Sequence, residues 1–157
     1  MIIIMQLIDF LPLAAIRVHV VAQSKKRALE IASEVAASNL NNSKLTLPIL
    51  EALINRERLG STGIGHGVGI PHCRLDGLKE PLMVLMTLEK GIDYQGIDNQ
   101  RVDIILTILV PAESTDLHLQ LLATIAEQFS KPHILERIRH AKTVQILYDT
   151  IANLTDE

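Results

Sequence analysis

Hydrophobic and polar residues follow two periods along the chain, one typical of helices and one typical of buried strands. Two nearly continuous apolar runs, Leu82–Leu88 and Val102–Val110, have the composition of strands that are covered on both faces. A shorter run at Val18–Val21 predicts a third strand, and Val68–Pro71 predicts a brief fourth. The segment Gly91–Asn99 is rich in turn residues and has room for a short edge strand.

Apolar residues elsewhere recur at the three- and four-residue spacing of helices. Ser24 and Thr143 are typical N-cap residues for the first and the last of these helices, and Thr46 begins the second. A long helix follows the second apolar run, and Ser130 with Pro132 starts a short one. The expected apolar faces are Ala28, Leu29, Ala32, Val35 and Ala36; Leu47, Leu50, Leu53 and Ile54; Leu119, Leu122, Ile125, Ala126 and Phe129; and Ile146, Leu147 and Ile151.

The order of these elements predicts an α/β fold, because two buried central strands with helices on both sides form a layered sandwich. A chain of 157 residues fits one domain with one sizeable core, so we expect a single domain over residues 1–157. The apolar start, Met1–Met5, lacks a basic region, so we expect a docked terminal segment and no targeting peptide.

Composition and charge exclude several classes of partner. Aromatic residues make up only 3% of the chain and the net charge is −3, which argues against a nucleic-acid partner. No stretch approaches the roughly 18 apolar residues that span a bilayer, so we expect no membrane insertion. Cys73 is the single cysteine, which excludes an internal disulfide framework and fits a cytoplasmic location.

The segment Leu59–Arg74 is the densest in chemical signals, with five glycines among the ten residues 60–69 and Pro71 directly before His72. It lacks the spacing of a dinucleotide fingerprint and the lysine of a P-loop. Two interpretations stay open: a hairpin-like turn that needs φ > 0 at several positions, or a group of backbone N–H donors for an oxyanion. In both, Pro71 gives His72 a defined heading.

Three of the six histidines stand where chemistry is plausible. His72 leaves the glycine-rich segment, His118 lies in the first turn of the helix after a buried strand, and His66 lies within the glycines. Ligand sites of open α/β sheets gather beyond the carboxyl ends of strands, so His72 and His118 could face each other. The other three, His19, His133 and His140, have the sequence context of ordinary polar positions.

Other chemistries are less well supported by the residues. Three histidines can hold zinc, so a site built from His66, His72 and His118 is an alternative, although no H-E-x-x-H spacing or carboxylate cluster accompanies them. A Cys73–His72 nucleophilic pair is disfavoured, because neighbours in extended backbone point to opposite faces. Arg56 stands at the end of a helix, where a cation is favourable, and could also reach a phosphate.

Several segments together resemble the enzyme IIA domains of the fructose/mannitol type in the bacterial phosphotransferase system, most closely the nitrogen-regulatory branch. The principal match is Arg56–Gly65 followed by Ile70–His72. Ser24–Glu30, Gly96–Gln100 and Leu109–Ala112 are similar to that branch as well.

The resemblance covers about residues 7–151 and implies a mixed β-sheet flanked by helices. It implies that His72 is the phosphorylated histidine, that His118 lies beside it and stabilises the phosphoryl group, and that Arg56 supplies charge or recognises the partner. It implies an HPr-like phosphocarrier as donor, with no cofactor and no metal. Gly69 stands where the family usually has alanine and Cys73 where glycine is commoner, and His66 is not a usual family residue.

The expected function is therefore that of a regulatory protein, phosphorylated on His72, that controls partner proteins through its phosphorylation state. Two alternatives remain: a sugar-specific enzyme IIA that passes phosphate to a IIB cysteine, and a non-catalytic module that binds an anion or a partner. With no room for a fused IIB or HPr domain in 157 residues, the regulatory branch is the expectation.

Overall fold

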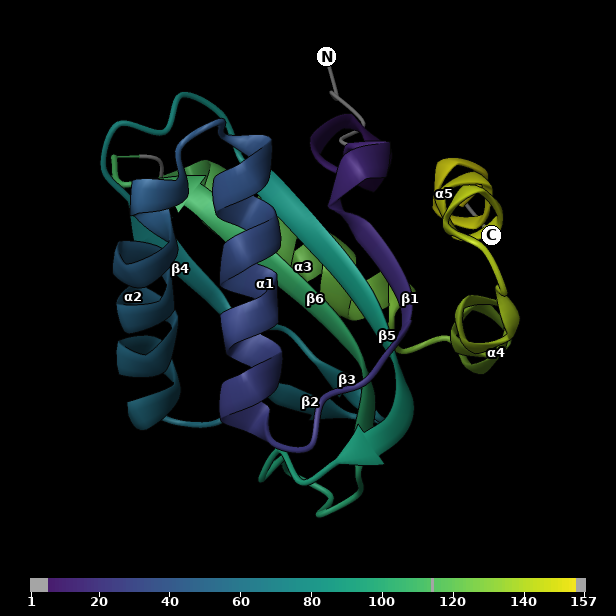
Figure 1. Ribbon diagram of the computed structural model, residues 1–157. Helices are drawn as coiled ribbons and strands as arrows, with labels where there is room; N and C mark the ends of the chain where they lie inside the picture. The colour runs from purple at the N-terminus through teal and green to yellow at the C-terminus, as the bar shows by residue number, and fades with distance from the viewer. Residues whose placement is uncertain (1–5, 114, 155–157) are drawn as a thin grey trace.

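A mixed β-sheet forms the centre of the computed structural model, which describes residues 6–113 and 115–154 (Figure 1). Over those residues its strands follow the order β1-β5-β6-β3-β2, and β4 also pairs with β6. Neighbours β1 and β5 are parallel, β5 and β6 are antiparallel, β3 and β4 both run parallel to β6, and β2 is antiparallel to β3. The strands are β1 (Ile16–Val20), β2 (Gly63–Gly65), β3 (Val68–Gly69), β4 (His72–Leu75), β5 (Leu82–Ile92) and β6 (Val102–Pro111).

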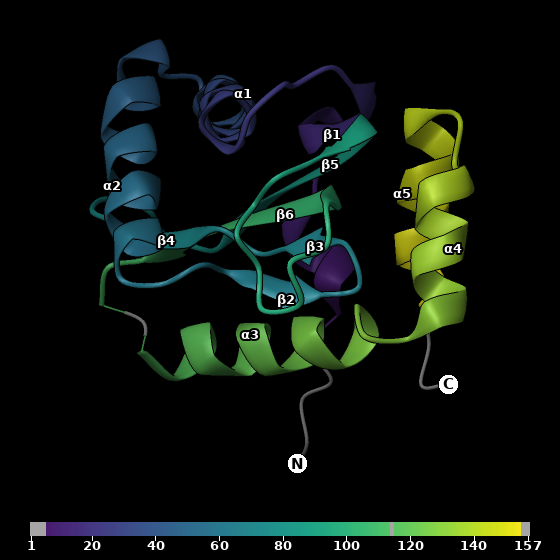
Figure 2. The ribbon, with the colours of Figure 1, turned by 90° about the horizontal axis from the view of Figure 1, so that it is seen from below.

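Helices cover both faces of the sheet, as the sequence predicts. Helices α1 (Lys25–Asn39) and α2 (Thr46–Arg58) lie on one face and α3 (Thr115–Gln128) on the other, as Figure 2 shows from below. Helices α4 (Pro132–His140) and α5 (Val144–Ala152) stand at the β1 edge, where α5 contacts β1. Short 3₁₀ helices are η1 (Leu7–Phe10), η2 (Leu13–Ala15) and η3 (Ser43–Leu45).

The two long apolar runs are the central strands, and every residue from Leu82 to Leu88 is buried. The layered α/β sandwich with a mixed sheet is therefore confirmed. Across residues 6–113 and 115–154, no helix has the length and apolar character needed to cross a membrane. The expected docking of Met1–Met5 lies outside the described residues.

Two of the predicted helix starts are made by the expected side chains. Ser24 Oγ accepts a hydrogen bond from the Arg27 N–H at 3.1 Å, and Thr143 Oγ1 accepts one from the Ile146 N–H at 3.1 Å. Helix α2 begins at Thr46 without a side-chain cap. Ser130 caps nothing in α4, because its hydroxyl donates to the Glu127 carbonyl instead.

The predicted apolar faces are wrong at four positions. Leu47, Leu119 and Ile146 are 61%, 61% and 50% exposed, and Ala126 is exposed as well. In α3 the buried stripe runs through Leu121 and Ile125, and residues two apart on a helix point in nearly opposite directions, so Leu119 faces away from the sheet.

Two expectations for the segments around the site also need correction. Val68–Pro71 is not one strand that His72 leaves: β3 ends at Gly69, and His72 is the first residue of β4. The pairs Val68↔Ile104 and His72↔Ile108 keep the same register along β6, so β3 and β4 pair with successive stretches of β6 as one interrupted strand. In the fully described stretch Gly91–Asn99 no separate edge strand forms, because β5 itself continues to Ile92 and the rest is turn.

Candidate functional site

A surface depression of about 440 Å³ lies where α2, β4 and α3 meet. Since β4 and β6 are parallel and paired, the start of β4 and the helix that follows β6 are brought to the same part of the sheet. The depression is lined by Ala52, Asn55, Arg56, Leu59, His72, Cys73, Arg74 and His118. The structure thus brings together the three residues to which the family resemblance assigned a role, His72, His118 and Arg56.

His72 is held in one orientation by its own backbone neighbourhood. Its Nδ1 lies 2.8 Å from the carbonyl oxygen of Ile70. A carbonyl can only accept a hydrogen bond, so Nδ1 carries the proton of the neutral ring. The lone pair of the neutral imidazole is therefore on Nε2. Pro71 lies between the two bonded residues and restricts the backbone there.

His118 faces His72 across the depression. The two ring centroids are 5.3 Å apart and the ring planes meet at 61°, an edge-to-face arrangement. His118 lies in the first turn of α3, as predicted, and is partly exposed. The two imidazole rings are thus close enough for one bound group to contact both.

Both histidines favour the neutral form. Burial lowers the pKa of His72 below its usual value of 6.5; the Ile70 carbonyl opposes that shift, Arg56 adds to it, and Glu57 opposes it. The pKa of His118 is lowered first by burial, then by His72 and by the guanidinium groups of Arg74 and Arg56. Loss of water disfavours the charged imidazolium, and nearby cations disfavour it further.

Two arginines give the depression its positive charge. Arg56 lies in the last turn of α2, and its Nη1 donates to the Gly60 carbonyl at 2.8 Å, which ties the helix to the glycine-rich segment. Arg74 was missed by the sequence analysis. It lies two residues after His72 on β4, where alternate residues share a face, and its Nη1 donates to the Ala112 carbonyl at 3.1 Å. Had the sequence analysis predicted a strand that starts at His72, the alternation of side chains along it would have placed Arg74 on the same face as His72.

The glycine-rich segment is a hairpin, which decides between its two interpretations. Strands β2 and β3 pair antiparallel around a turn in which His66 has φ 59° and Gly67 has φ 80°. The N–H groups of Gly63, His66 and Ile70 are already bonded within the protein, to Ser61 Oγ, Asp98 Oδ2 and the Thr62 carbonyl. These amides are not free to hold an anion.

His66 lies apart from the other two histidines. It lines a different hollow, and its carbonyl accepts a hydrogen bond from Arg139, whose Nε also bonds Asp103 at 2.9 Å. Within residues 6–113 and 115–154, no group of three or more His, Cys, Asp or Glu side chains could hold a metal ion. The three-histidine zinc alternative is therefore wrong.

Cys73 does not form a nucleophilic pair with His72. The side chain is buried, and burial raises the pKa of its thiol to about 12. A thiol in that state stays protonated near neutral pH and is a poor nucleophile. Cys73 is a small buried residue in the wall of the depression, as expected of a residue that fills space.

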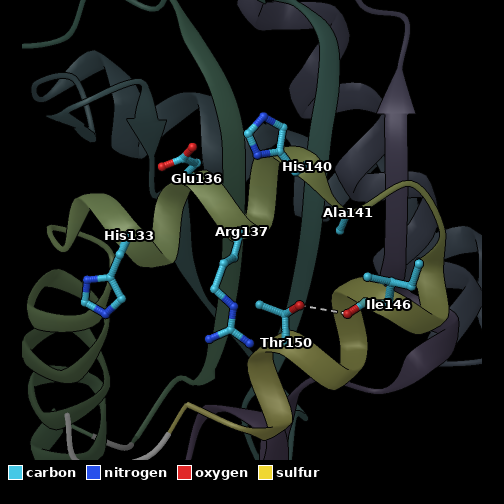
Figure 3. Close-up of a pocket in the computed structure, with 7 residues that line it drawn as sticks. All are labelled: His133, Glu136, Arg137, His140, Ala141, Ile146 and Thr150. Atoms are coloured by element: carbon cyan, nitrogen blue, oxygen red, sulfur yellow. Dashed lines mark hydrogen bonds between the residues drawn. The ribbon is translucent and has the colours of Figure 1, made fainter.

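Another hollow lies between α4 and α5, at the opposite end of the sheet from α2 (Figures 2 and 3). In Figure 3, Arg137 extends toward Thr150, whose hydroxyl donates to the Ile146 carbonyl at 2.8 Å. The charges of Arg137 and Glu136 offset each other there. The exposed His133 and His140 of this hollow lack the converging partners found around His72.

Comparison with known proteins identifies the family of the chain. The family model of the phosphoenolpyruvate-dependent sugar phosphotransferase system, EIIA 2, matches residues 9–154. The nitrogen regulatory protein of Escherichia coli K12 is 43% identical over 141 residues, which cover 87% of this chain and 82% of that protein. The nitrogen regulatory protein of Klebsiella oxytoca is 41% identical over 148 residues, covering 94% and 90%.

The crystal structure of the nitrogen regulatory protein IIA-Ntr from Neisseria meningitidis superposes with a TM-score of 0.85 at 30% identity. The match covers 92% of this chain and 97% of that one. Fold and sequence likeness thus agree over nearly the whole chain. It belongs to the EIIA 2 family of the phosphoenolpyruvate-dependent sugar phosphotransferase system, in the branch of the nitrogen regulatory proteins.

Proposed function

We propose that His72 accepts a phosphoryl group on Nε2 from the phosphohistidine of an HPr-like phosphocarrier. The observation that carries the proposal is the His72 ring, whose Nδ1 is bonded to the Ile70 carbonyl so that the lone pair is left on Nε2, and whose centroid lies 5.3 Å from that of His118. Family membership supports it, because the family is one of phosphotransferase components.

The proposed step needs no acid or base. The Nε2 lone pair forms the new bond to phosphorus while the bond from phosphorus to the donor nitrogen breaks and its electron pair returns to that nitrogen. No proton leaves His72, because Nε2 carries none in this tautomer. Positioning and charge stabilisation dominate such phosphoryl transfers.

Three side chains stabilise the transferred group in this scheme. His118 donates a hydrogen bond to a phosphoryl oxygen, and the guanidinium groups of Arg56 and Arg74 offset its negative charge. Because both histidines have a pKa below 6.5, the acceptor is neutral at physiological pH. No metal ion or organic cofactor enters the step.

The rim of the depression suits a transient protein partner. Leu59 is 84% exposed at the end of α2, and Leu119 is 61% exposed next to His118. Large apolar side chains exposed together beside a functional site are a feature of surfaces that bind a partner. We assign this surface to the donor phosphocarrier.

The test is incubation with a phosphorylated HPr-like carrier, followed by detection of acid-labile phosphate on this protein. His72→Ala is expected to abolish labelling. His118→Ala removes one hydrogen bond to a charged group, worth about 1.5–3 kcal/mol, so transfer is expected to slow roughly 10- to 150-fold.

The exposed His133 on α4 offers a matched control, and His133→Ala is expected to accept phosphate at the normal rate. Labelling that persists in His72→Ala would show that the acceptor has been assigned to the wrong residue. An unchanged rate in His118→Ala would remove His118 from the mechanism.

The downstream role we propose is regulation of partner proteins by the phosphorylation state of His72, as the name of the nitrogen regulatory relatives suggests. Affinity capture with phosphorylated protein and with His72→Ala should then retain different partners. Rapid transfer of the phosphoryl group to the cysteine of a sugar-specific IIB component would favour the sugar-transport alternative instead.

A further inference from the structure

A buried polar cluster adjoins the depression and joins four separate parts of the chain. It consists of Lys25 at the start of α1, Glu57 near the end of α2, Thr62 at the start of the hairpin, and Tyr94 after β5. The Glu57 side chain is only 7% exposed, Thr62 is 5% exposed and Tyr94 is fully buried. A carboxylate so far from water needs donors around it.

Four donors converge on the two oxygens of Glu57. Oε2 accepts from Lys25 Nζ at 2.6 Å and from the Thr62 N–H at 3.2 Å. Oε1 accepts from the hydroxyl of Thr62 and, at 3.2 Å, from that of Tyr94. Thr62 is thus held to Glu57 through both its backbone and its side chain, so its peptide has little freedom to move.

A short relay of hydrogen bonds leads from Thr62 to the acceptor ring. The Thr62 carbonyl accepts a hydrogen bond from the Ile70 N–H at 3.0 Å. The Ile70 carbonyl accepts in turn from His72 Nδ1 at 2.8 Å. The same residue, Ile70, therefore has its N–H fixed by the cluster and its carbonyl used to fix the ring.

The Tyr94 ring supports the same stretch of backbone from another direction. A Cβ at Gly69 would lie 2.8 Å from Tyr94 Cζ, so the ring packs directly against the residue before Ile70. The Lys25 ammonium stands 4.2 Å from the centre of that ring, which holds the ring in place by a cation–π interaction. Gly69 thus has a packing role that alanine could not fill without moving the ring.

We propose that Glu57, acting through Thr62, is a positioning residue that keeps the Ile70 carbonyl where it holds the His72 proton on Nδ1. The proposal rests on the proposed function, because it explains why Nε2 is free to attack phosphorus. The same carbonyl also serves the product: once Nε2 is phosphorylated the ring gains cationic character, and its Nδ1–H donates a stronger bond.

The test reads the proton position on the His72 ring directly, by nitrogen-15 NMR of the imidazole in the unphosphorylated protein. The wild type is expected to carry the proton on Nδ1. Thr62→Val removes the hydroxyl bonds to Glu57 and Tyr94 and should shift the tautomer ratio toward Nε2–H by about 2- to 10-fold, the effect of one hydrogen bond. Thr62→Ser keeps the hydroxyl and should restore the wild-type ratio.

The phosphotransfer rate supplies a second readout. Thr62→Val should lower the rate at saturating donor by a similar factor with little change in the donor concentration needed for half-maximal rate, because the docking surface is intact. Thr107→Val is the matched control, since Thr107 is a fully buried threonine on β6 whose hydroxyl has no hydrogen-bond partner among the described residues, 6–113 and 115–154. It should leave both the tautomer and the rate unchanged.

A wild-type ring protonated on Nε2, or a folded Thr62→Val protein with the wild-type tautomer ratio, overturns the proposal. If Thr62→Val does not fold, Tyr94→Phe keeps the ring on Gly69 but removes one donor to Glu57, and an unchanged tautomer ratio there has the same meaning. The ring measurement needs no phosphate donor. Failure to accept phosphate therefore contradicts the proposed function. An unchanged tautomer ratio of the His72 ring in these variants contradicts only the hydrogen-bond relay.

Discussion

The ion pair of Lys25 and Glu57 is expected to be among the most energetically coupled polar contacts in the molecule. All four groups around the Glu57 carboxylate are donors, so only a carboxylate can accept at both oxygens. In Glu57→Gln, an NH₂ group at the Oε2 position meets the Lys25 ammonium and the Thr62 N–H, neither of which can accept; at the Oε1 position it can donate to the two hydroxyls, but the ammonium still loses its negative partner. We expect that substitution to lower the free energy of unfolding by about 3–5 kcal/mol, the usual cost of breaking a buried ion pair.

Lys25→Met should cost less, about 1.5–3 kcal/mol. Glu57 keeps its three other donors in that variant, and Lys25 is 19% exposed, so water partly compensates. In the double variant the glutamine amide no longer meets the ammonium. The combined loss should therefore fall short of the sum of the single losses by about 1–3 kcal/mol.

Urea unfolding followed by circular dichroism measures all three variants. With a slope of about 2 kcal/mol per molar urea, Glu57→Gln should lower the midpoint by roughly 1.5–2.5 M. A control is Arg27 with Glu34, an ion pair at 3.7 Å on the surface of α1 whose side chains are 50% and 57% exposed. Removing Glu34 should change stability by less than about 1 kcal/mol. Additive losses for Lys25 and Glu57, within about 0.5 kcal/mol, would refute the reasoning.

Three further outcomes are expected. NMR titration of His72 and His118 should give pKa values below 6.5, and values at or above 6.5 would contradict the effect of burial. Just below pH 6.5 the unfolded chain binds more protons than the folded one, so the stability that the two neutral rings contribute is complete above about pH 6.5 and is lost as the pH falls through their folded pKa values. Gly69→Ala should lower the free energy of unfolding by about 1–3 kcal/mol in thermal or urea unfolding, since its Cβ would meet the Tyr94 ring at 2.8 Å, and a neutral result would show that the ring yields freely. Thr107→Val should leave stability unchanged or raise it by about 1 kcal/mol in the same assay, because it removes a buried hydroxyl that has no partner in the part of the chain that the structure describes; a clear loss would mean that the hydroxyl has a partner in solution.

Much of the fold is predictable from local pattern because the two central strands have no exposed face. Continuous apolar runs allow few interpretations, and Leu82–Leu88 is accordingly buried throughout. N-caps depend on one side chain and its own helix, so Ser24 and Thr143 are also predictable. Helix faces are harder: Leu119 is apolar and correctly spaced, but the sheet lies on the side of Leu121.

The sequence by itself determined the layered α/β architecture, the position of His72 after Pro71 and the candidacy of His118, because these depend on hydrophobic period, on proline geometry and on residue type. Only the tertiary structure decided that His72 begins a strand, and therefore that Arg74 shares its face. It also decided that Glu57 meets Lys25, Thr62 and Tyr94. Those contacts join residues from different helices, strands and loops, and sequence spacing carries no signal for a hydrogen bond that exists only once the sheet and its helices have packed.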